Sequence, residues 1–172
     1  MEEVTGSNPV PPTNFMKRVY SQPFVIVRAF IQKGGKFLLI QEAWGEVKGL
    51  WNFPAGWLDV GEDPLTAVKR ETKEETGYDF TPTSLLGIYS YTKSEGGQIK
   101  HALDLVFRGE ISGAQDTVDV TEVSQMRWFS PEEIYEMDSS KLRDKVTKQM
   151  TKDYLSGQEY PLDLLTHLVT RK

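Results

Sequence analysis

Short apolar stretches separated by turn-forming residues predict five strands. Residues 24–31 read FVIVRAFI, and their β-branched and aromatic side chains are typical of a buried strand. The paired glycines in Lys33–Lys36 accept positive φ, so they predict a hairpin turn into a return strand at 37–41. A short apolar stretch, residues 50–53, follows ahead of Pro54. The other three strands are expected at 85–92, 101–110 and 125–129.

Helix signals occur in three places. Residues 64–76 have Asp63 at the cap position, proline at the first helical position and Gly77 just past the end. Ser130-Pro131-Glu132-Glu133 begins a second helix in the manner of a capping box. From residue 140 to 172 the pattern predicts a mostly helical tail, with helices at 141–150 and 162–169 and a break at 157–161.

The order of strands, one central helix, more strands and then helices predicts an α/β or α+β sandwich. The 172 residues fit one domain, which we place at 22–172. Residues 1–21 contain Pro9, Pro11 and Pro12 without apolar periodicity, so we expect a flexible N-terminal arm. A homodimer in which the arm or the helical tail contacts a second subunit is the alternative arrangement.

Composition and charge exclude several kinds of site. With 20 basic and 25 acidic residues the net charge is −5, which argues against nucleic acid or an anionic membrane as the main partner. The chain has no cysteine and two histidines, which excludes disulfides, thiolate or multi-histidine metal sites and cysteine nucleophiles. No signal-peptide pattern and no apolar run of membrane-spanning length occurs, so we expect a soluble, cytoplasmic protein.

Acidic residues concentrate around the central helix. Residues 56–78 contain six acids and three bases, and therefore more than half of the net charge. Glu71, Glu74 and Glu75 have i, i+3, i+4 spacing, which puts three mutually repelling carboxylates on one helix face. Such a face suits Mg²⁺ or Mn²⁺, because these hard ions prefer oxygen ligands and cancel the repulsion. A merely solvated charged face is the alternative; the alternating acids of a calcium-binding loop are absent.

The same segment resembles the Nudix box, G-x5-E-x7-R-E-U-x-E-E-x-G-U, in which U is usually aliphatic. All of its fixed positions match, namely Gly56, Glu62, Arg70, Glu71, Glu74, Glu75 and Gly77. Thr72 and Tyr78 depart from the pattern at two positions that concern packing. Residues 51–56, WNFPAG, look like the strand and turn that precede the box in this family. The resemblance implies a Nudix-type α/β/α sandwich with a mixed sheet over roughly 22–138, followed by the helical tail.

The resemblance also implies an activity and a set of site residues. Nudix hydrolases use Mg²⁺ or Mn²⁺ and water to split a diphosphate bond in a nucleoside diphosphate linked to another moiety. By position, the implied metal ligands are the Gly56 carbonyl, Glu71, Glu74, Glu75 and Glu122. Arg70 would orient carboxylates, and Glu62 would lie near the metal. Either Glu122 or a box glutamate would be the general base, with Asp116 and Asp119 as weaker candidates.

The substrate is less well defined by the sequence. Phe53, Trp57 and Tyr91 are the candidates for substrate contacts, and Trp44, Tyr89 and Phe107 could also stack on a base; core packing is the alternative for each of them. Lys93 and Ser94 stand where some Nudix subfamilies have a proline or tyrosine, so no subfamily substrate transfers. A catalytically silent Nudix domain that senses a ligand is the rival function. Such domains usually lose box glutamates, and every one is present here.

Overall fold

The computed structural model describes residues 23–95, 97–113 and 121–168. The predicted N-terminal arm, Asp116 and Asp119 lie outside the described residues, as does the end of the predicted tail helix at 169.

The centre of the fold is a mixed β-sheet with seven strands in the described part of the chain. Strand β1 pairs with β6 in parallel, and the other strand pairs are antiparallel. The main order is β3-β2-β1-β6-β5, with β4 paired to β1 and β7 paired to β2. The strands are β1 (Phe24–Lys33), β2 (Lys36–Glu42), β3 (Trp51–Asn52), β4 (Ala55–Trp57), β5 (Asp79–Glu95), β6 (Gln98–Ser112) and β7 (Val123–Phe129).

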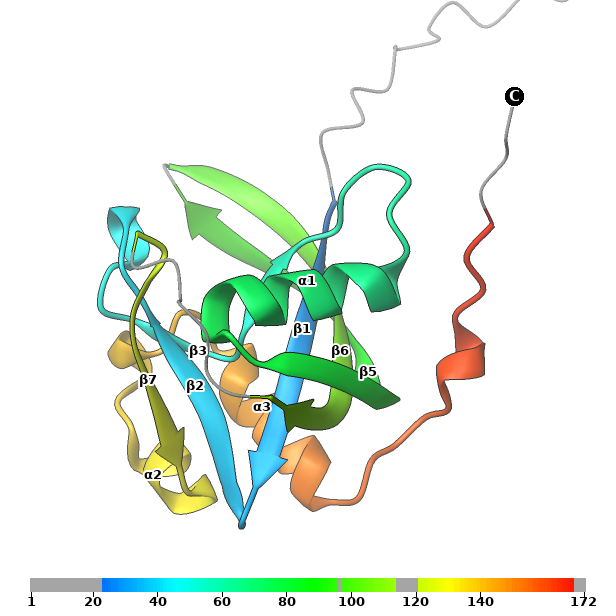
Figure 1. Ribbon diagram of the computed structural model, residues 1–172. Coiled ribbons are helices and arrows are strands. Elements are labelled where there is room, and N and C mark those ends of the chain that lie inside the picture. Colours follow the sequence, from blue (N-terminus) through cyan, green and yellow to red (C-terminus); the bar gives the residue numbers. More distant parts are fainter. Residues whose placement is uncertain (1–22, 96, 114–120, 169–172) are drawn as a thin grey trace, which may run out of the picture.

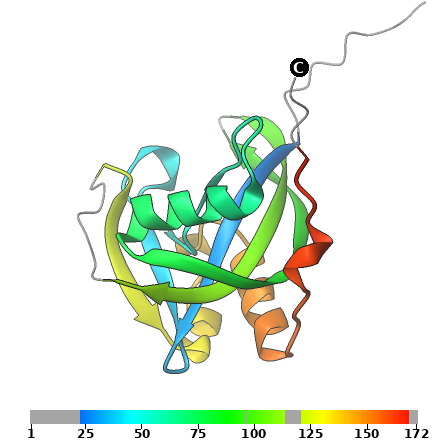
Figure 2. The ribbon, with the colours of Figure 1, turned by 45° about the vertical axis from the view of Figure 1, so that its right-hand side comes forward.

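Helices cover both faces of this sheet, as the sandwich prediction requires (Figures 1 and 2). Helix α1 (Pro64–Thr76) lies on one face, and α2 (Pro131–Glu136) and α3 (Val146–Leu155) lie on the other. Each face has its own apolar core. Ala67 and Val68 of α1 pack in one core, and Ile134 of α2 and Met150 of α3 pack in the other. None of the helices in the described part of the chain is long and apolar enough to span a membrane.

Helix α1, which carries the acidic motif, has the ends that its sequence predicts. The Asp63 side chain accepts hydrogen bonds from the backbone N–H groups of Leu65 (2.8 Å) and Thr66 (3.1 Å). Gly77 ends the helix with φ at 73°, a left-handed conformation that side chains disfavour. The Ser130 capping box is likewise confirmed at the start of α2.

Two expectations about the elements are wrong. Strand β5 begins at Asp79 rather than at 85, because its first residues already pair with the end of β6. The tail is much less helical than predicted. Its only α-helix in the described residues is α3, together with short 3₁₀ turns at Ser139–Lys141 and Leu162–Leu164.

Tertiary pairing explains why the helix predicted at 141–150 does not begin there. Leu142 forms a bridge with Trp51, and the Arg143 N–H donates to the Trp51 carbonyl (3.0 Å), so this segment is extended. At 142–143, backbone pairing with a strand therefore overrides the local helical pattern. Tyr160, in the predicted break, pairs with Leu85 of β5 through two backbone hydrogen bonds of 2.8 Å.

The cap of α1 can be tested by mutation. We expect Asp63→Ala to lower the free energy of unfolding by about 0.5–2 kcal/mol, because two backbone N–H groups lose their acceptor. Asp63→Ser keeps an acceptor and should lose much less. Chemical denaturation of the three proteins measures both changes. Equal stability of Asp63→Ala and the wild type would contradict a stabilising cap.

Candidate active site

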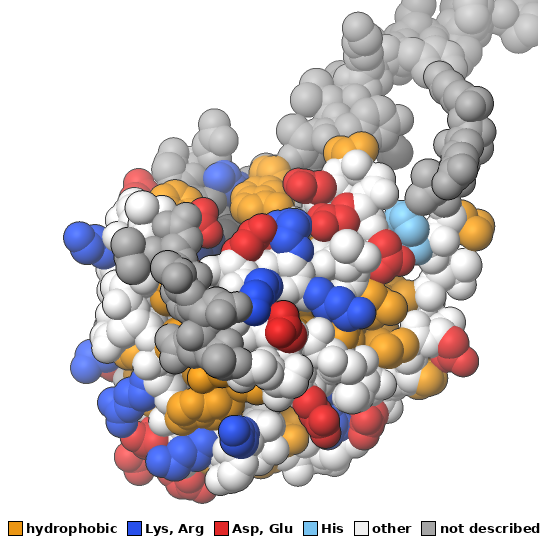
Figure 3. Space-filling model, viewed as in Figure 1, with side chains coloured by type: hydrophobic (Ala, Val, Ile, Leu, Met, Phe, Trp, Pro, Cys, Tyr) orange, Lys and Arg blue, Asp and Glu red, His pale blue; other side chains and the backbone are white. Residues whose placement is uncertain are grey.

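Most of the predicted site residues meet in a cleft of about 380 Å³. Its walls come from the β2 end and the β4–α1 segment, and Phe24 and Ile26 of β1 belong to its lining. Figure 3 shows acidic and basic side chains intermixed on the α1 side of the molecule. The carboxylates that line the cleft are Glu42, Asp59, Glu71, Glu74, Glu75 and Glu122.

Strand β4 and helix α1 touch so closely that only glycine fits at position 56. A Cβ added to Gly56 would fall on the carboxylate of Glu71. Gly56 pairs with Val27 of β1, so this glycine joins the acidic helix to the centre of the sheet. The backbone carbonyl of Gly56 and the Glu71 side chain therefore belong to one wall of the cleft.

The Glu75 carboxylate lies under β4. It accepts a hydrogen bond from the Ala55 N–H (2.8 Å), and the residue is only 7% exposed. Burial raises the pKa of Glu75 well above its ordinary value of 4.5, the Ala55 hydrogen bond opposes this rise, and the charges of Glu42, Glu71 and Glu122 add to it. Glu75 is therefore a carboxyl group that takes on negative charge only at a cost in free energy.

Arg70 binds the other acids of the motif. Its guanidinium donates two hydrogen bonds of 3.0 Å to Glu62, one of 2.7 Å to Glu71 and one of 3.3 Å to Glu74. The hydrogen bond from Arg70 lowers the pKa of Glu62. Burial raises the pKa of Glu71, which the Arg70 contact opposes and the charges of Glu74 and Glu122 reinforce. Arg70 thus orients carboxylates.

Glu122 reaches the cleft from the loop before β7. Its backbone carbonyl accepts a hydrogen bond from the Ala43 N–H (2.9 Å), which ties this loop to the end of β2. Its side chain lines the cleft close enough for its charge to raise the pKa values of Glu71 and Glu75. The distal acid and the box acids therefore face the same space.

The aromatic candidates separate into two groups. Trp57 and Tyr91 line the cleft, as does Trp44. Trp57 is half exposed and rests edge-on against Phe24, with 4.8 Å between ring centroids. Phe53 does not line the cleft. It is fully buried against Phe30, with 4.3 Å between ring centroids, so its predicted substrate contact is wrong.

Two further aromatic candidates also lie outside the described cleft lining. Phe107 is fully buried in the core under α1. Tyr89 donates a hydrogen bond to Asp153 of α3 (2.9 Å) and packs against the other core. Both therefore have packing roles.

The donor chemistry of the cleft suits a hard divalent cation, because its acidic residues offer only oxygen ligands. The carboxylates nevertheless do not converge as the helix spacing predicts. No three acidic or histidine side chains of the described residues form a preassembled ligand set. Glu71 and Glu74 are held by Arg70, whereas Glu75 is held by the Ala55 N–H. The acidic side chains therefore line the same cleft, but their carboxylates do not converge on one common position within it.

Four polar residues of the cleft are not among those that the sequence pattern singles out. Arg28 on β1 is 2% exposed and pairs with Asp104 of β6 at 2.7 Å. Glu42 at the end of β2 pairs with Arg143, and Asn52 of β3 contacts both Arg28 and Glu42. Charged residues inside the apolar strand patterns were the available signal for Arg28 and Glu42. No local pattern marks Arg143, because the chain fold alone brings it to the cleft.

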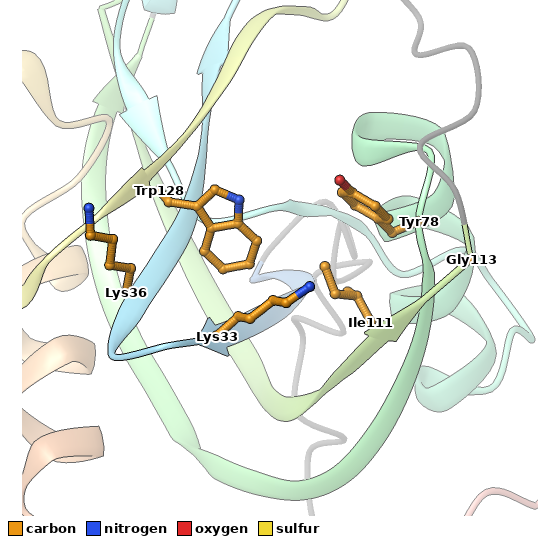
Figure 4. Close-up of a pocket in the computed structure, with 6 residues that line it drawn as sticks. All are labelled: Lys33, Lys36, Tyr78, Ile111, Gly113 and Trp128. Atoms are coloured by element: carbon orange, nitrogen blue, oxygen red, sulfur yellow. The ribbon is translucent and has the colours of Figure 1, made fainter.

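A second hollow lies elsewhere on the molecule. Figure 4 shows Trp128 and Tyr78 on opposite sides of it, with Lys33 reaching toward Ile111 between them. Its described lining also includes Lys36 and Gly113 and contains no carboxylate. The part of its lining that the structure describes therefore offers no carboxylate ligand for a divalent cation.

The sequence model of the NUDIX domain matches residues 22–152. The chain is similar to the protein named Phosphatase NudJ from Escherichia coli K12, with 31% identity over 144 residues, 84% of this chain and 91% of that protein. These matches cover most of the described domain and include the whole acidic motif.

Solved structures agree with this relation. A NUDIX hydrolase from Nitrosomonas europaea superposes with a TM-score of 0.78 and 34% identity, covering 86% of this chain and 98% of that one. The NUDIX domain of Shewanella oneidensis NrtR, solved with ADP ribose, has a TM-score of 0.63 and 17% identity, covering 83% and 94%. The latter likeness concerns the fold alone.

The buried carboxyl of Glu75 predicts a pH dependence of stability. Since its folded pKa lies above 4.5, the folded state binds the proton more tightly than the unfolded state. The free energy of unfolding should therefore fall as pH rises from about 4.5 through the folded pKa. Thermal melting between pH 5 and 8 with a chelator present should show this fall in the wild type, and a smaller one in Glu75→Gln.

The matched control is Glu136→Gln at an exposed position of α2, and this variant should follow the wild-type profile. At pH 7.5 with chelator, Glu75→Gln should melt no lower than the wild type, because glutamine keeps an acceptor for the Ala55 N–H. A lower melting temperature would mean that the charge of Glu75 stabilises the fold.

Proposed function

The chain belongs to the Nudix hydrolase family, and from that premise we propose that it hydrolyses a diphosphate bond in a nucleoside diphosphate linked to another moiety. One observation carries the proposal: every acid of the Nudix box except Glu62 and Asp63 lines a single cleft, together with the distal Glu122. Half-exposed Trp57 and partly buried Tyr91 at the same cleft suit a planar base.

Members of this family typically depend on a divalent metal ion. We assign its ligands to the Gly56 carbonyl and to the carboxylates of Glu71, Glu74, Glu75 and Glu122. When bound, Mg²⁺ or Mn²⁺ supplies positive charge next to the diphosphate and lowers the pKa of water. The raised pKa values of Glu71 and Glu75 support this assignment, since a cation would compensate charges that the protein leaves poorly solvated.

The chain's own residues then have distinct tasks. Glu122 accepts the proton of the attacking water as its oxygen bonds to phosphorus and the bond to the leaving phosphoryl oxygen breaks. Arg70 holds Glu71 and Glu74 in fixed orientations through its forked donors. Trp57 and Tyr91 contact the nucleoside or the attached moiety. Glu62, bound by Arg70, keeps that guanidinium in place.

The position of the broken bond needs its own measurement. The name of the Escherichia coli relative, Phosphatase NudJ, suggests release of a terminal phosphate, whereas the family resemblance suggests cleavage between two substituted phosphates. A sensor domain would bind such ligands and break no bond. Product analysis distinguishes the three outcomes.

We therefore expect hydrolysis when a panel of nucleoside diphosphate derivatives is incubated with the protein and millimolar Mg²⁺, and no hydrolysis with excess EDTA. Chromatography and phosphate release identify the products. Glu75→Gln should lose most of the turnover, whereas Glu136→Gln on α2 should keep it. Full activity in EDTA would contradict the carboxylate site, and binding without turnover across the panel would indicate a sensor.

The general base is tested separately. Glu122→Gln should lower kcat by about 10²- to 10⁴-fold, the usual contribution of a general base. Glu110→Gln on β6 serves as the control at an exposed glutamate remote from the cleft lining. If Glu122→Gln turns over as fast as the wild type, the base is another group.

A further inference from the structure

The cleft contains three arginines whose donors are used to different extents. Arg28 is 2% exposed, and each of its three guanidinium nitrogens contacts a side chain of Asp104, Asp144 or Asn52. Burial against these groups leaves Arg28 no direction in which to meet a ligand. Its positive charge is therefore used within the protein, in the ion pairs that form the floor of the cleft.

Arg70 is also saturated. All three of its nitrogens donate hydrogen bonds, to Glu62, Glu71, Glu74 and the Trp57 carbonyl. Its single positive charge is shared among three carboxylates. Arg70 therefore supplies no net attraction for an anionic substrate.

Arg143 differs from both. Its side chain is 21% exposed and lines the cleft, and one terminal nitrogen pairs with Glu42. Within the described part of the chain, Glu42 is the only side chain that its guanidinium contacts. A guanidinium has five N–H donors, so most of those on Arg143 remain available in the cleft.

The backbone around Arg143 is fixed although the side chain is not saturated. The Arg143 N–H donates to the Trp51 carbonyl (3.0 Å), and the neighbouring Asp144 caps α3 by accepting from the N–H groups of Val146 and Thr147, both at 3.1 Å. Arg143 is therefore a positioned cation with unused donors, a combination suited to recognising phosphate.

We propose that Arg143 binds a non-bridging phosphoryl oxygen of the substrate diphosphate through the N–H donors that Glu42 leaves unused. This assignment rests on the proposed function and adds to it a positive contact from outside the Nudix box. Glu42 holds the guanidinium at the cleft, and the diphosphate is the anion it recognises. No lysine lies among the described lining residues, and every guanidinium nitrogen of Arg28 and Arg70 already has a protein partner, so Arg143 is the cation of this lining with most donors unused.

The test uses methylenediphosphonate, a diphosphate analogue that carries no nucleoside and cannot be hydrolysed. Its dissociation constant is measured by calorimetry at saturating Mg²⁺ for the wild type and variants. Arg143→Ala should weaken binding by about 10- to 100-fold, the size expected for a hydrogen bond to a charged group. Arg127→Ala, an exposed arginine on β7 paired with Glu133, is the matched control and should bind as the wild type does.

Two further variants distinguish binding of the diphosphate by Arg143 from a role in which Arg143 only neutralises Glu42. Arg143→Ala leaves the 3%-exposed Glu42 without its cation and should melt lower than the wild type. Adding Glu42→Gln should restore the melting temperature, but the double variant should still bind the analogue weakly. Glu42→Gln alone should bind at least as tightly as the wild type.

Unchanged affinity in Arg143→Ala would overturn the proposal, as would recovery of affinity in the double variant or absence of binding by the wild type. These results are independent of the product analysis described above. If the wild type hydrolyses nucleoside diphosphate derivatives while Arg143→Ala binds the analogue normally, only the role of Arg143 fails.

Discussion

The close contact between β4 and α1 is the constraint on which the site depends. Because Gly56 lacks a side chain, the Glu71 carboxylate occupies the space beside the strand, and Glu75 reaches the Ala55 N–H beneath it. The inner side of α1 permits this approach with small residues. Thr72 and Thr76 are buried, and their hydroxyls donate to carbonyls four residues earlier, at 2.7 and 2.6 Å. The threonine at a position where the family pattern prefers an aliphatic residue therefore satisfies its own polar group.

The close contact between β4 and α1 also determines how the negative charges in the cleft are compensated. The acids of α1 approach a sheet that cannot hydrate them, and one guanidinium, Arg70, pairs with two of them, Glu71 and Glu74, and with Glu62 ahead of the helix. Glu75 is beyond its reach: in the described residues it accepts one backbone hydrogen bond and pairs with no basic side chain. The carboxylates of the motif therefore lie in different environments, although their spacing along the helix is regular. Glu74 has a side chain that is 49% exposed, whereas Glu75 is buried, and this difference comes from the strand above them.

Local signals predicted most of the fold and the part of the site that lies on one helix. Asp63, Pro64 and Gly77 marked the ends of α1 correctly, because caps and positive-φ glycines act within a few residues. The start of the tail was misjudged because Leu142 pairs with the distant strand β3, and such pairing leaves no periodic trace in the tail sequence itself. Phe53 was misassigned for a related reason: its neighbours in the sequence are site residues, but its side chain points into the core. Arg143 can be recognised as a cleft residue only in the folded chain, in which η2 (Ser139–Lys141) and α3 are placed against β3.

The buried ion network at the cleft floor explains how such distant segments are brought into register. Arg28 of β1 joins Asp104 of β6 to Asp144, and Asp144 in turn caps α3. A buried ion pair is weak evidence for stability, since desolvation offsets its attraction, but its directional contacts define one arrangement of the three segments. Apolar residues of similar volume could fill the same space without specifying where α3 begins. Since Arg143 directly precedes Asp144, the network that anchors α3 to the sheet also sets the position of the unsaturated guanidinium. The cleft therefore has a rigid acidic wall built by β4 and α1, and a positive group placed by an independent set of contacts.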